Sequence, residues 1–513
     1  MTSVTTLQPL QIEVDGSSLS AIAEDALREI SISQRLSESS LCTLTFVEPQ
    51  SDDFIAASRL MPGTKLKLYS STRPQAVFSG VIKGFEYHYG PAGERVVRVS
   101  ARDDLYPLVK RQPVKAHVQV TVPEMAETML AGLGISVAAP ETGPVWDHII
   151  QHRVSDLAFL KDYAERSGLY FFLQDDTLHF YPLQAARTGI VLEYRRSLLE
   201  LSLKNDSDWS TESVTVQGWN PWRAESQTGQ AQAQQDIDDF AVQRLLSDQP
   251  AQSDTQLDIL AAAELGRAAA LRHSVGGSAE GDFRLVPGAS VRIEGVDASL
   301  SGLYLLTAVE HRINAVQGYI SVFDTAPPKP VRRALNTTAT MAHVTQLEDP
   351  ERLGRIKVLL PGYNDVESDW LEVVMPGAGV DKGLIMLPDI GDTVLVLLLN
   401  GRPDQAVVIG GLFGQHGPPD QNVKDNAVHR YSWLTPGGQT IRMNDRGAVI
   451  SIVNRSGSRV ELNGDSIKLE TSGGQILEMD DQTLRLHAET DCCIEAPGRT
   501  LVLKADKINF ERG

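Results

Sequence analysis

The chain has 513 residues, more than one hydrophobic core usually organises, so its length predicts three or more domains. It carries 47 Lys and Arg against 66 Asp and Glu, a formal net charge of -19 without a basic stripe, so we expect no nucleic-acid partner. The longest apolar run, Val394 to Leu399, is far below the roughly 18 residues that a membrane span needs. We therefore expect no stable membrane insertion.

The N-terminal residues MTSVTTLQPLQIEVDG lack a basic region followed by an apolar stretch, so we expect no secretory signal and assembly in the cytoplasm. The three cysteines, Cys42, Cys492 and Cys493, have no CxxC spacing that would suit a metal or a redox pair, and we expect them to be small buried hydrophobic residues. Because Cys492 and Cys493 are neighbours in a strand-like run, at most one of them can face a core.

Strand patterns such as LQIEVDG, CTLTFVE and RVVRVSARD, separated by Pro, Gly, Ser and Asp, predict a first hub-like β-barrel domain over residues 1–115. A helical and hairpin segment is expected over residues 116–190. In this segment Ser155 is placed to cap the helix DLAFLKDYAERSG, which closes at Gly168. The hairpin that follows is predicted to turn at the Asp175–Asp176 pair.

Strand patterns return over residues 191–325, which predict a second β-barrel domain. Its polar, Gln-rich insert, residues 221–250, is expected to lie on the surface or to be disordered, and the Ala- and Leu-rich stretch after it predicts a helix. The two β domains share an ordered trio, in which MPGTKLKLY, Gly80 and FEYH match VPGASVRIE, Gly302 and VEHR. The trio indicates a duplicated domain, although strands and turns draw on few residue types.

The Pro-rich stretch TAPPKPVRRALNTT predicts an interdomain linker over residues 326–340. Five or six short strands are then expected over residues 341–415, as in a small barrel of the OB type. One of them, TVLVLLLN, is apolar on both faces, so both faces should be covered, and a subunit neighbour could cover the outer one. A connector over residues 416–439 leads to the last region.

Residues 440–513 predict a ladder of short strands, whose apolar centres are seven to ten residues apart. Turn-forming pairs such as Asn-Gly, Asp-Asp, Gly-Gly and Pro-Gly separate the strands. The candidate core residues are Ile441, Ile450, Val460, Ile467, Ile476, Leu484, Leu501 and Ile508.

Rungs of one strand each cannot enclose a core within a single chain, because only alternate residues face inward. Burying roughly a dozen Val, Ile and Leu side chains at about 1.5 to 3 kcal/mol each would contribute on the order of 20 kcal/mol per chain, but only if partners cover them. Three copies winding about a shared axis would cover these side chains and pair every strand edge. The single-chain alternatives are a parallel β-helix and a flat, exposed sheet.

Nearly end to end, the chain resembles the VgrG-type central spike proteins of contractile injection systems. The most specific stretch lies between Asp349 and Gly414, where DPERLGRIKVLLPG, DWLEVVMPGAG, GLIMLPDIGDTVLVLLLNG and RPDQAVVIGGLFG are similar to the OB domain of those spikes. A second stretch, SDLAFLKDYAERSGLYFF, is similar to the helix-to-strand passage of the phage hub-like domain. The resemblance implies a mainly β chain with duplicated hub-like β-barrels, a helical segment, an OB-fold barrel and a C-terminal intertwined trimeric β-helix.

The resemblance also implies partners and a role. A homotrimer with two barrels per subunit would match a hexameric inner tube protein at the hub end, among baseplate proteins, while its threefold needle punctures a target envelope. Some related needles end in a His-x-His motif that binds a metal, and this chain lacks the motif, so a PAAR-like tip protein is expected at the needle end. The residues expected to contact the tip protein are Lys507, Ile508, Asn509, Phe510, Glu511 and Arg512.

The ladder ends at residues 507–513 without a fused cargo domain, as in the spike of an extracellular, phage-tail-like particle. We therefore expect assembly in the cytoplasm and a final place in such a particle. A type VI secretion VgrG or a phage tail spike is the alternative. More remote alternatives are a trimeric receptor-binding fibre, which would need an aromatic-rich tip, and a peptidoglycan hydrolase, which would need an added domain.

Candidate chemical sites are weak. Paired carboxylates such as Asp103–Asp104 and Asp175–Asp176 could serve glycoside hydrolysis, but neighbouring acids diverge in strands and are solvated in turns. His148 and His152 precede a helix without further metal ligands nearby. We expect no catalytic residue, no metal and no cofactor, and hence a structural protein rather than an enzyme.

Overall fold

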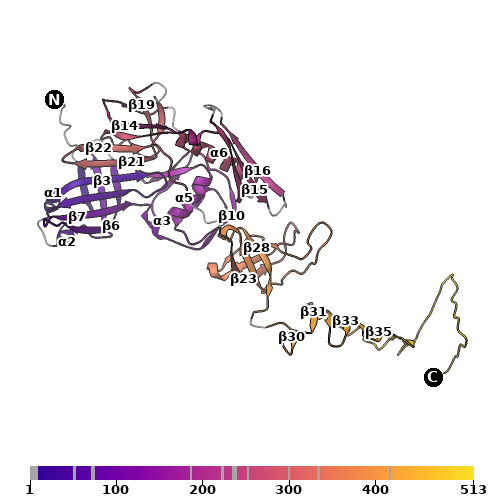
Figure 1. The fold of residues 1–513 in the computed structure, drawn as a ribbon. Coiled ribbons are helices and arrows are strands. Elements are labelled where there is room, and N and C mark those ends of the chain that lie inside the picture. Colours follow the sequence, from indigo (N-terminus) through magenta and orange to yellow (C-terminus); the bar gives the residue numbers. More distant parts are fainter. Residues whose placement is uncertain are drawn as a thin grey trace. The chain divides into compact units, whose positions relative to one another are not determined.

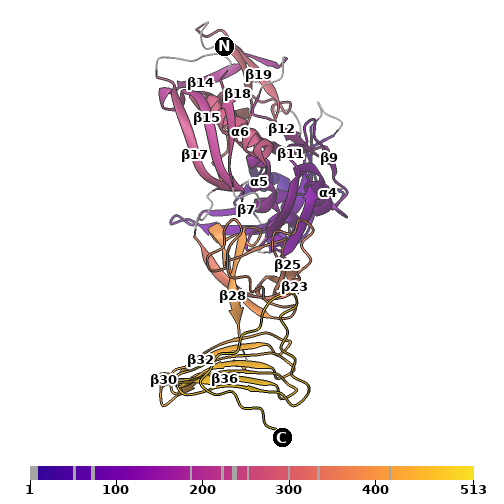
Figure 2. The same cartoon turned by 90° about the vertical axis from the view of Figure 1, so that its right-hand side faces the viewer.

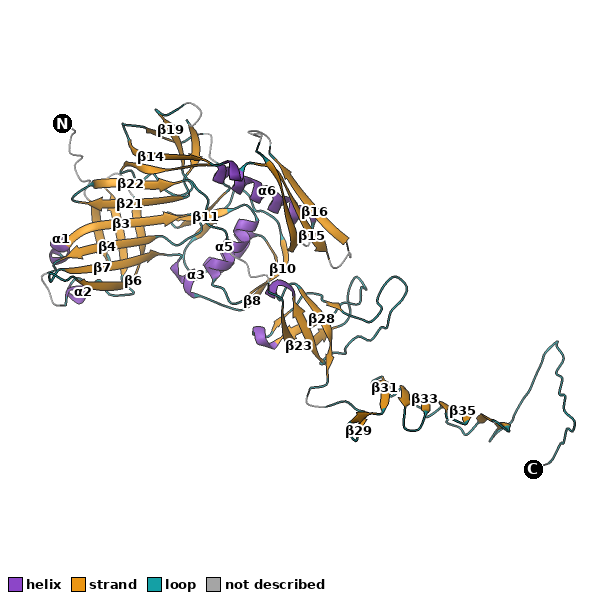
Figure 3. Cartoon of the chain, in the orientation of Figure 1, coloured by secondary structure: helices purple, strands orange, loops and turns teal. Residues whose placement is uncertain are grey.

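The computed structural model describes residues 10–49, 53–70, 75–184, 188–220, 225–233, 240–250, 253–297, 301–331, 336–414 and 417–512. The chain divides into two compact units, residues 1–412 and 413–513, and each is described by itself. Strands predominate and helices are few (Figure 3). The fold is mainly β, with curled half-barrel sheets, an OB domain and a C-terminal series of antiparallel strands (Figure 1).

The largest sheet of the first unit joins strands from both predicted barrel domains. Its order is β14-β18-β22-β21-β3-β4-β7-β6-β5-β1-β2. Two short helices, α1 (Ala21–Ala26) and α2 (Phe54–Ala57), accompany it. The strands are β1 (Leu10–Val14), β2 (Ser17–Ser18), β3 (Leu27–Arg35), β4 (Leu41–Val47), β5 (Lys65–Ser70), β6 (Ala76–Tyr89), β7 (Arg95–Asp103), β14 (Leu198–Asn205), β18 (His273–Glu280), β21 (Ala308–Asn314) and β22 (Gly318–Asp324).

Strand order repeats in the two halves of this sheet. The first half runs β3-β4-β7-β6-β5, and the second runs β14-β18-β22-β21, continued by a separate sheet of β13 (Ile190–Glu193), β19 (Ser290–Glu294) and β20 (Gly302–Leu305). The long strand β6 therefore corresponds to β20 and β21 together. The repeated order agrees with the shared sequence trio, because Gly80 and the FEYH stretch both lie in β6, whereas Gly302 and VEHR lie in β20 and β21.

The two halves meet by direct strand pairing and not as separate barrels. Strand β3 of the first half pairs antiparallel with β21 of the second half, and Ile32 lies opposite His311. Apolar residues on both sides of this junction, among them Ile32, Phe283 and Ile313, belong to one buried cluster. We call these two related halves the hub: they share one 11-stranded sheet, and β13, β19 and β20 of the second half form a separate sheet.

The helical segment lies between the two halves in the sequence, and its structure confirms two local predictions. Ser155 Oγ accepts a hydrogen bond from Ala158 N at the start of α5, and Gly168 follows the helix with a φ of 69°. The hairpin turns at Asp175–Asp176, both with positive φ. The elements are α3 (Tyr106–Lys110), β8 (Lys115–Val120), α4 (Val122–Leu130), β9 (Ser136–Ala138), β10 (Trp146–Gln151), α5 (Asp156–Arg166), β11 (Tyr170–Gln174) and β12 (Thr177–Tyr181).

The polar insert is more ordered than its composition indicates. After the 3-10 turn η1 (Ser207–Trp209), strand β15 (Thr211–Asn220) lies between β16 (Glu225–Gln232) and β17 (Val242–Pro250), while residues 221–224 and 234–239 lie outside the described residues. The predicted helix is α6 (Asp254–Arg272), which packs on β15 and β16 (Figure 3). Val214 and Val216 form a buried cluster with Leu257 and Ala261. Of the two alternatives expected for the insert, a surface position or disorder, its described strands exclude disorder.

The OB domain is one six-stranded sheet of order β25-β24-β23-β27-β28-β26. Strand β27 buries alternate residues, Val394, Val396 and Leu398, and leaves its other face half-buried, so one face is covered within the chain. The elements are β23 (Thr338–Gln346), β24 (Lys357–Leu360), η2 (Pro361–Tyr363), β25 (Val366–Glu367), β26 (Glu372–Val373), β27 (Thr393–Leu398), η3 (Leu399–Gly401) and β28 (Ala406–Leu412).

Contacts with the helical segment hold the OB domain. Arg402 donates to Tyr163 Oη at 2.8 Å and to the Asp404 carboxylate, and His152 Nε2 lies 3.1 Å from the Gly401 carbonyl. Ile150 belongs to the OB core cluster. Within the described residues, no helix is both long and apolar enough to cross a membrane.

The buried His311 makes the stability of the hub depend on pH. Its Nδ1 lies 3.0 Å from Ser321 Oγ and 3.1 Å from Tyr319 Oη, and burial lowers the pKa of His311 to about 4. Between that value and the ordinary pKa of about 6.5, the unfolded chain binds a proton that the folded chain does not, so stability falls as the pH falls.

We predict that, between about pH 7 and about pH 4, the wild type loses about 3 kcal/mol more unfolding free energy than His311→Gln. Urea unfolding at several pH values, followed by hydrogen exchange of β21 and β22, measures the difference. Equal pH slopes for the two proteins would contradict it.

A second prediction concerns the buried ion pair of the OB domain. Asp349 accepts hydrogen bonds from Arg355 Nε at 3.0 Å and Nη2 at 2.6 Å and from the backbone N of Leu353 at 2.9 Å. The hydrogen bond with Arg355 holds the pKa of Asp349 well below its usual range. Asp349→Asn should therefore destabilise the OB domain by about 3 kcal/mol or more, because the buried Arg355 loses the charge of the carboxylate that accepts two of its hydrogen bonds.

The matched control is Glu351→Gln, because Glu351 is exposed and its carboxylate lies 3.6 Å from the Arg355 guanidinium. This control should lower the free energy of unfolding by less than about 0.5 kcal/mol. Hydrogen–deuterium exchange over residues 340–412 of the full chain distinguishes the two variants. The contribution of Asp349 to the free energy of unfolding is fully present above the ordinary carboxyl pKa and is lost as the pH falls below it. The hydrogen-exchange protection of the two variants should therefore converge in acid. Equal protection of the two variants at pH 7 would refute the assignment.

Candidate interaction surface on the C-terminal strand series

The second unit consists of a seven-stranded antiparallel sheet and its flanking segments. Strands β31 to β37 pair in chain order, and Figure 2 shows them side by side. A hairpin of β29 (Val423–Lys424) and β30 (Ala427–Val428) precedes them. The strands are β31 (Arg430–Leu434), β32 (Thr440–Asn444), β33 (Val449–Val453), β34 (Arg459–Leu462), β35 (Ser466–Glu470), β36 (Ile476–Asp480) and β37 (Leu484–His487).

The pairing register aligns apolar residues into two columns on one face, which we call the apolar face. Each column crosses all seven strands without a polar residue. The first column is Tyr431, Met443, Ile450, Leu462, Ile467, Met479 and Leu484. The second column is Trp433, Ile441, Ile452, Val460, Leu469, Leu477 and Leu486.

The opposite face, the polar face, carries a central column of polar and charged residues. Charges of opposite sign alternate across its later strands, and Glu470 at the side accepts ion pairs from Arg459 at 2.8 Å and Lys468 at 3.0 Å. The central column is Ser432, Arg442, Ser451, Glu461, Lys468, Glu478 and Arg485. A face of this kind is suited to water.

The connector folds over the polar face. Asp420 accepts hydrogen bonds from Ser432 Oγ at 2.6 Å and Arg430 Nε at 2.9 Å, and it lies 3.4 Å from Arg442 Nε. The hydrogen bond with Arg430, followed by that with Ser432, keeps the pKa of Asp420 below its usual value. The chain therefore covers part of its polar face.

The apolar face stays open in the single chain. Over the described residues 417–512 no apolar side chain is buried, and Asp420 is the only buried residue. Ile452 and Trp433 are 46% and 51% exposed. A contiguous exposed surface of this size on a folded sheet marks a contact with another molecule.

Most of the predicted core residues share this face. Ile476 does not, because it pairs with Glu470 and His487 on the polar side, and its neighbour Leu477 faces the apolar side instead. Leu501 and Ile508 lie after the last strand, and both are exposed. The predicted residues on the apolar face are Ile441, Ile450, Val460, Ile467 and Leu484.

Two further expectations need correction. The ladder was expected to begin after the connector, but β31 lies within residues 416–439, and its alternating Tyr431 and Trp433 were the available signal. Strands β31 to β37 pair with one another within the chain, because each turn returns the chain antiparallel, so only the outer edges of β31 and β37 are open to a partner copy in this sheet. Partners are thus needed to cover a face rather than to complete hydrogen bonds here.

Residues 488–512 form no strand in the single chain. Cys492 and Cys493 are exposed in this segment, unlike the buried Cys42, and Cys493 Sγ donates to Glu495 Oε1 at 3.0 Å. The residues expected to contact a tip protein also lie here, with Phe510 89% exposed. The described residues contain no group of three His, Cys, Asp or Glu side chains placed to hold a metal.

Comparison with known proteins places the first unit in a family. Residues 4–315, more than half of the chain, match the Alg8 N-terminal domain family. The chain belongs to this family. Residues 340–413 of this Alg8-family chain match the type VI secretion system and phage-baseplate injector OB domain, which confirms the predicted OB domain.

Curated relatives of the Alg8-family chain match it only locally. The Vibrio cholerae type VI secretion system spike protein VgrG3 is 35% identical over 65 residues, 12% of this chain and 6% of that protein. The V. cholerae actin cross-linking toxin VgrG1 is 32% identical over 78 residues, 14% of this chain and 7% of that protein. The chain thus spans a small part of the length of these relatives.

Solved structures show the fold of the Alg8-family chain. An Escherichia coli type VI secretion component, c3393, described as similar to the phage T4 tail proteins gp27 and gp5, matches with a TM-score of 0.53 and 16% identity over 78% of this chain and 99% of that one. VgrG in a Francisella PdpA–VgrG complex matches with a TM-score of 0.58 and 8% identity over 95% of this chain and 89% of that one. The Alg8-family chain therefore has a VgrG-like and gp27–gp5-like fold.

We predict that Ile452→Asp disrupts the contact made by the apolar face, because Ile452 lies between Ile441 and Val460 and a buried unpaired carboxylate costs several kcal/mol. Light scattering after size-exclusion chromatography should show a lower oligomeric mass. The matched control is Ser451→Asp on the polar face, which should keep the wild-type mass. The assignment of the faces fails if both variants assemble alike.

Proposed function

We propose that this protein is a structural, homotrimeric spike and hub at the baseplate of a contractile injection system. The observation that supports it most is the apolar face of β31–β37, whose two uninterrupted columns have no cover in the described part of the chain. The VgrG-like and gp27–gp5-like fold supplies the context, since the similar E. coli chain belongs to a type VI secretion system. The role is mechanical, and no step of it requires catalysis.

Three apolar faces that turn toward one axis would form a closed prism with the charged polar faces outside. The apolar side chains are already partly shielded by their neighbours, so the added burial is worth on the order of 10 kcal/mol per chain, about half of full burial. Part of this gain offsets the loss of freedom on association. Each wall of the prism is a sheet that is complete within one chain, so force along the axis loads in-chain hydrogen bonds.

The hub end fits a sixfold partner. Each chain supplies two halves with the same strand order, so three chains supply six related halves, the number of subunits in a hexameric inner tube protein. Baseplate proteins would surround this hub. The needle itself would remain threefold.

The last segment suits a different kind of contact. Residues 488–512 have no strand partner within the described chain and expose Leu501, Val502 and Leu503. Their backbone groups would pair with neighbouring copies, which is the intertwined arrangement expected for the needle. A PAAR-like tip protein would then cover Lys507–Arg512.

The type of particle to which the spike belongs is the most specific part of the proposal. An extracellular, phage-tail-like particle, assembled in the cytoplasm, is proposed on the sequence resemblance alone. A type VI secretion spike has a specific observation in its favour, namely the local identity to VgrG3. Immunogold labelling distinguishes the two, because released tail-like particles would carry the label in the first case and the cell envelope would carry it in the second.

We predict that the purified protein sediments as a species of 168 kDa, three times the chain mass of 56.0 kDa. Three copies are expected because the apolar face of each must be covered. Analytical ultracentrifugation over a range of concentrations measures the mass. A stable single chain, or a two-chain sandwich of apolar faces, would overturn the proposal.

A further inference from the structure

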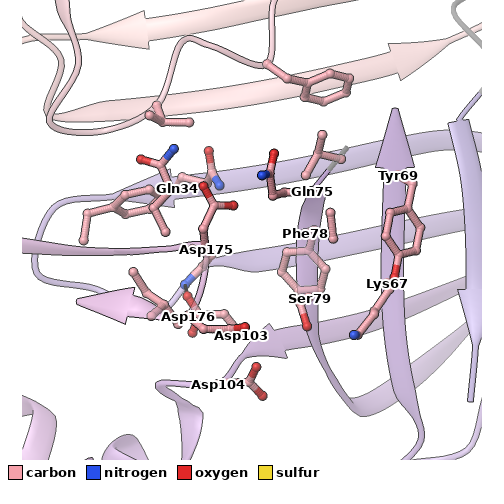
Figure 4. Close-up of a pocket in the computed structure, with 18 of the residues that line it drawn as sticks. Gln34, Lys67, Tyr69, Gln75, Phe78, Ser79, Asp103, Asp104, Asp175 and Asp176 are labelled. Atoms are coloured by element: carbon pink, nitrogen blue, oxygen red, sulfur yellow. Dashed lines mark hydrogen bonds between the residues drawn. The ribbon is translucent and has the colours of Figure 1, made fainter. Parts of the chain in front are cut away.

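A cavity of about 480 Å³ lies in the hub and is not part of the proposed needle contact. Strands β3, β5 and β6, the β11–β12 turn and residues of the second half all contribute to its lining, as Figure 4 shows for the labelled side chains. Its volume is in the range of small-molecule sites in proteins. The cavity therefore has the size for a ligand or for one side chain of a partner.

Four acidic residues line the cavity. They are Asp103, Asp104, Asp175 and Asp176, and they face Lys67 and His311 among the other lining residues. Burial, together with the charge of Asp176, raises the pKa of Asp104. A cation in the cavity would stabilise the ionised form of Asp104 and offset its repulsion by Asp176.

These acids differ in their own partners. Asp103 accepts hydrogen bonds from Ser39 Oγ at 2.6 Å and from the backbone N of Ser40 at 2.7 Å, so it is held by the chain. Asp175 and Asp176 occupy the two central positions of the β11–β12 turn, where Asn-Gly is the usual pair. Asp tolerates this positive φ, and both carboxylates of the turn are among the residues that line the cavity.

An independent observation points to a missing donor. Gln34 lines the cavity, is only 7% exposed, and its Oε1 has no hydrogen-bond partner. A buried carbonyl oxygen without a donor destabilises the fold, so native structures rarely leave one unpaired. A ligand that carries N–H groups would satisfy Gln34 and the carboxylates together.

The remaining lining limits the chemistry of the ligand. No three of the carboxylates lie close enough to form a metal site within the described residues, so a compact divalent ion fits poorly. Phe78, Phe172 and Phe283 supply aromatic walls. Aromatic faces and spread carboxylates suit an organic cation with an apolar stem.

We propose that this cavity binds a guanidinium or primary ammonium group, with Asp104, Asp175, Asp176 and the Oε1 of Gln34 as acceptors. The group belongs either to a free small molecule or to an Arg or Lys side chain of a partner polypeptide. The shared chemistry is the same in both cases. The site lies in the hub and does not depend on the trimeric needle.

Titration calorimetry on the full wild-type chain tests the proposal with three probes: agmatine, Nα-acetyl-arginine methylamide and magnesium chloride. We expect one of the guanidinium probes to bind below about 10 mM and magnesium to fail. Tighter binding of the amide supports a polypeptide side chain as the natural occupant, and tighter binding of agmatine supports a free ligand.

The test variant is Asp176→Asn, which keeps a residue that tolerates the positive φ of 57° and should weaken guanidinium binding about tenfold or more. Its matched control is Asp381→Asn, at an exposed OB-domain position with a φ of 56°, which should bind as the wild type does. Unchanged melting of both variants shows that the fold is kept. No guanidinium binding by the wild type, equal binding by Asp176→Asn, or magnesium binding that depends on Asp176 would overturn the proposal.

Discussion

The cross-strand register of β31–β37 sorts the side chains of this sheet into an apolar face and a charged face, and the proposed assembly depends on that separation. A slip by one residue would bring Arg442 and Lys468 to the apolar face, so the register cannot vary. Local hydrogen bonds at the turns help to hold it: Asp480 accepts the backbone N–H groups of Gln482 and Thr483 at 2.8 and 2.6 Å. The register of this sheet is therefore specified by residues of a single chain.

The two units solve the burial problem differently. The hub and OB domain enclose their own cores, with fully buried residues such as Phe46, Phe171 and Val396. The strand series buries no apolar residue over residues 417–512, so its stability is tied to association. The connector reinforces this difference, because Asp420 binds Arg430 and Ser432 on the polar face and leaves the apolar face free. A chain arranged in this way favours assembly over a stable free needle.

Local signals in the sequence predict local structure well here. The cap at Ser155, the turn at Asp175–Asp176 and the helix α6 depend on neighbouring residues, and all three are present. Errors arise where pairing between strands decides the outcome. Ile476 and Leu477 are equally apolar neighbours, and only pairing with Leu469 and Leu486 selects Leu477 for the apolar face. The β3–β21 pairing and the cavity around Gln34 could not be predicted for a different reason, because they join residues that are far apart in sequence.

The duplication in the hub is approximate, and this bears on how it would meet a sixfold tube. In the first half a single strand, β6, spans Ala76–Tyr89 and changes register between Ile82 and Gly84. In the second half the chain breaks into β20 and β21, and β13 pairs in parallel with β19. Six halves from three chains would thus present two alternating surfaces. A ring of identical tube subunits can bind both only through features that the halves share, and these are the backbone strand order and the short sequence trio.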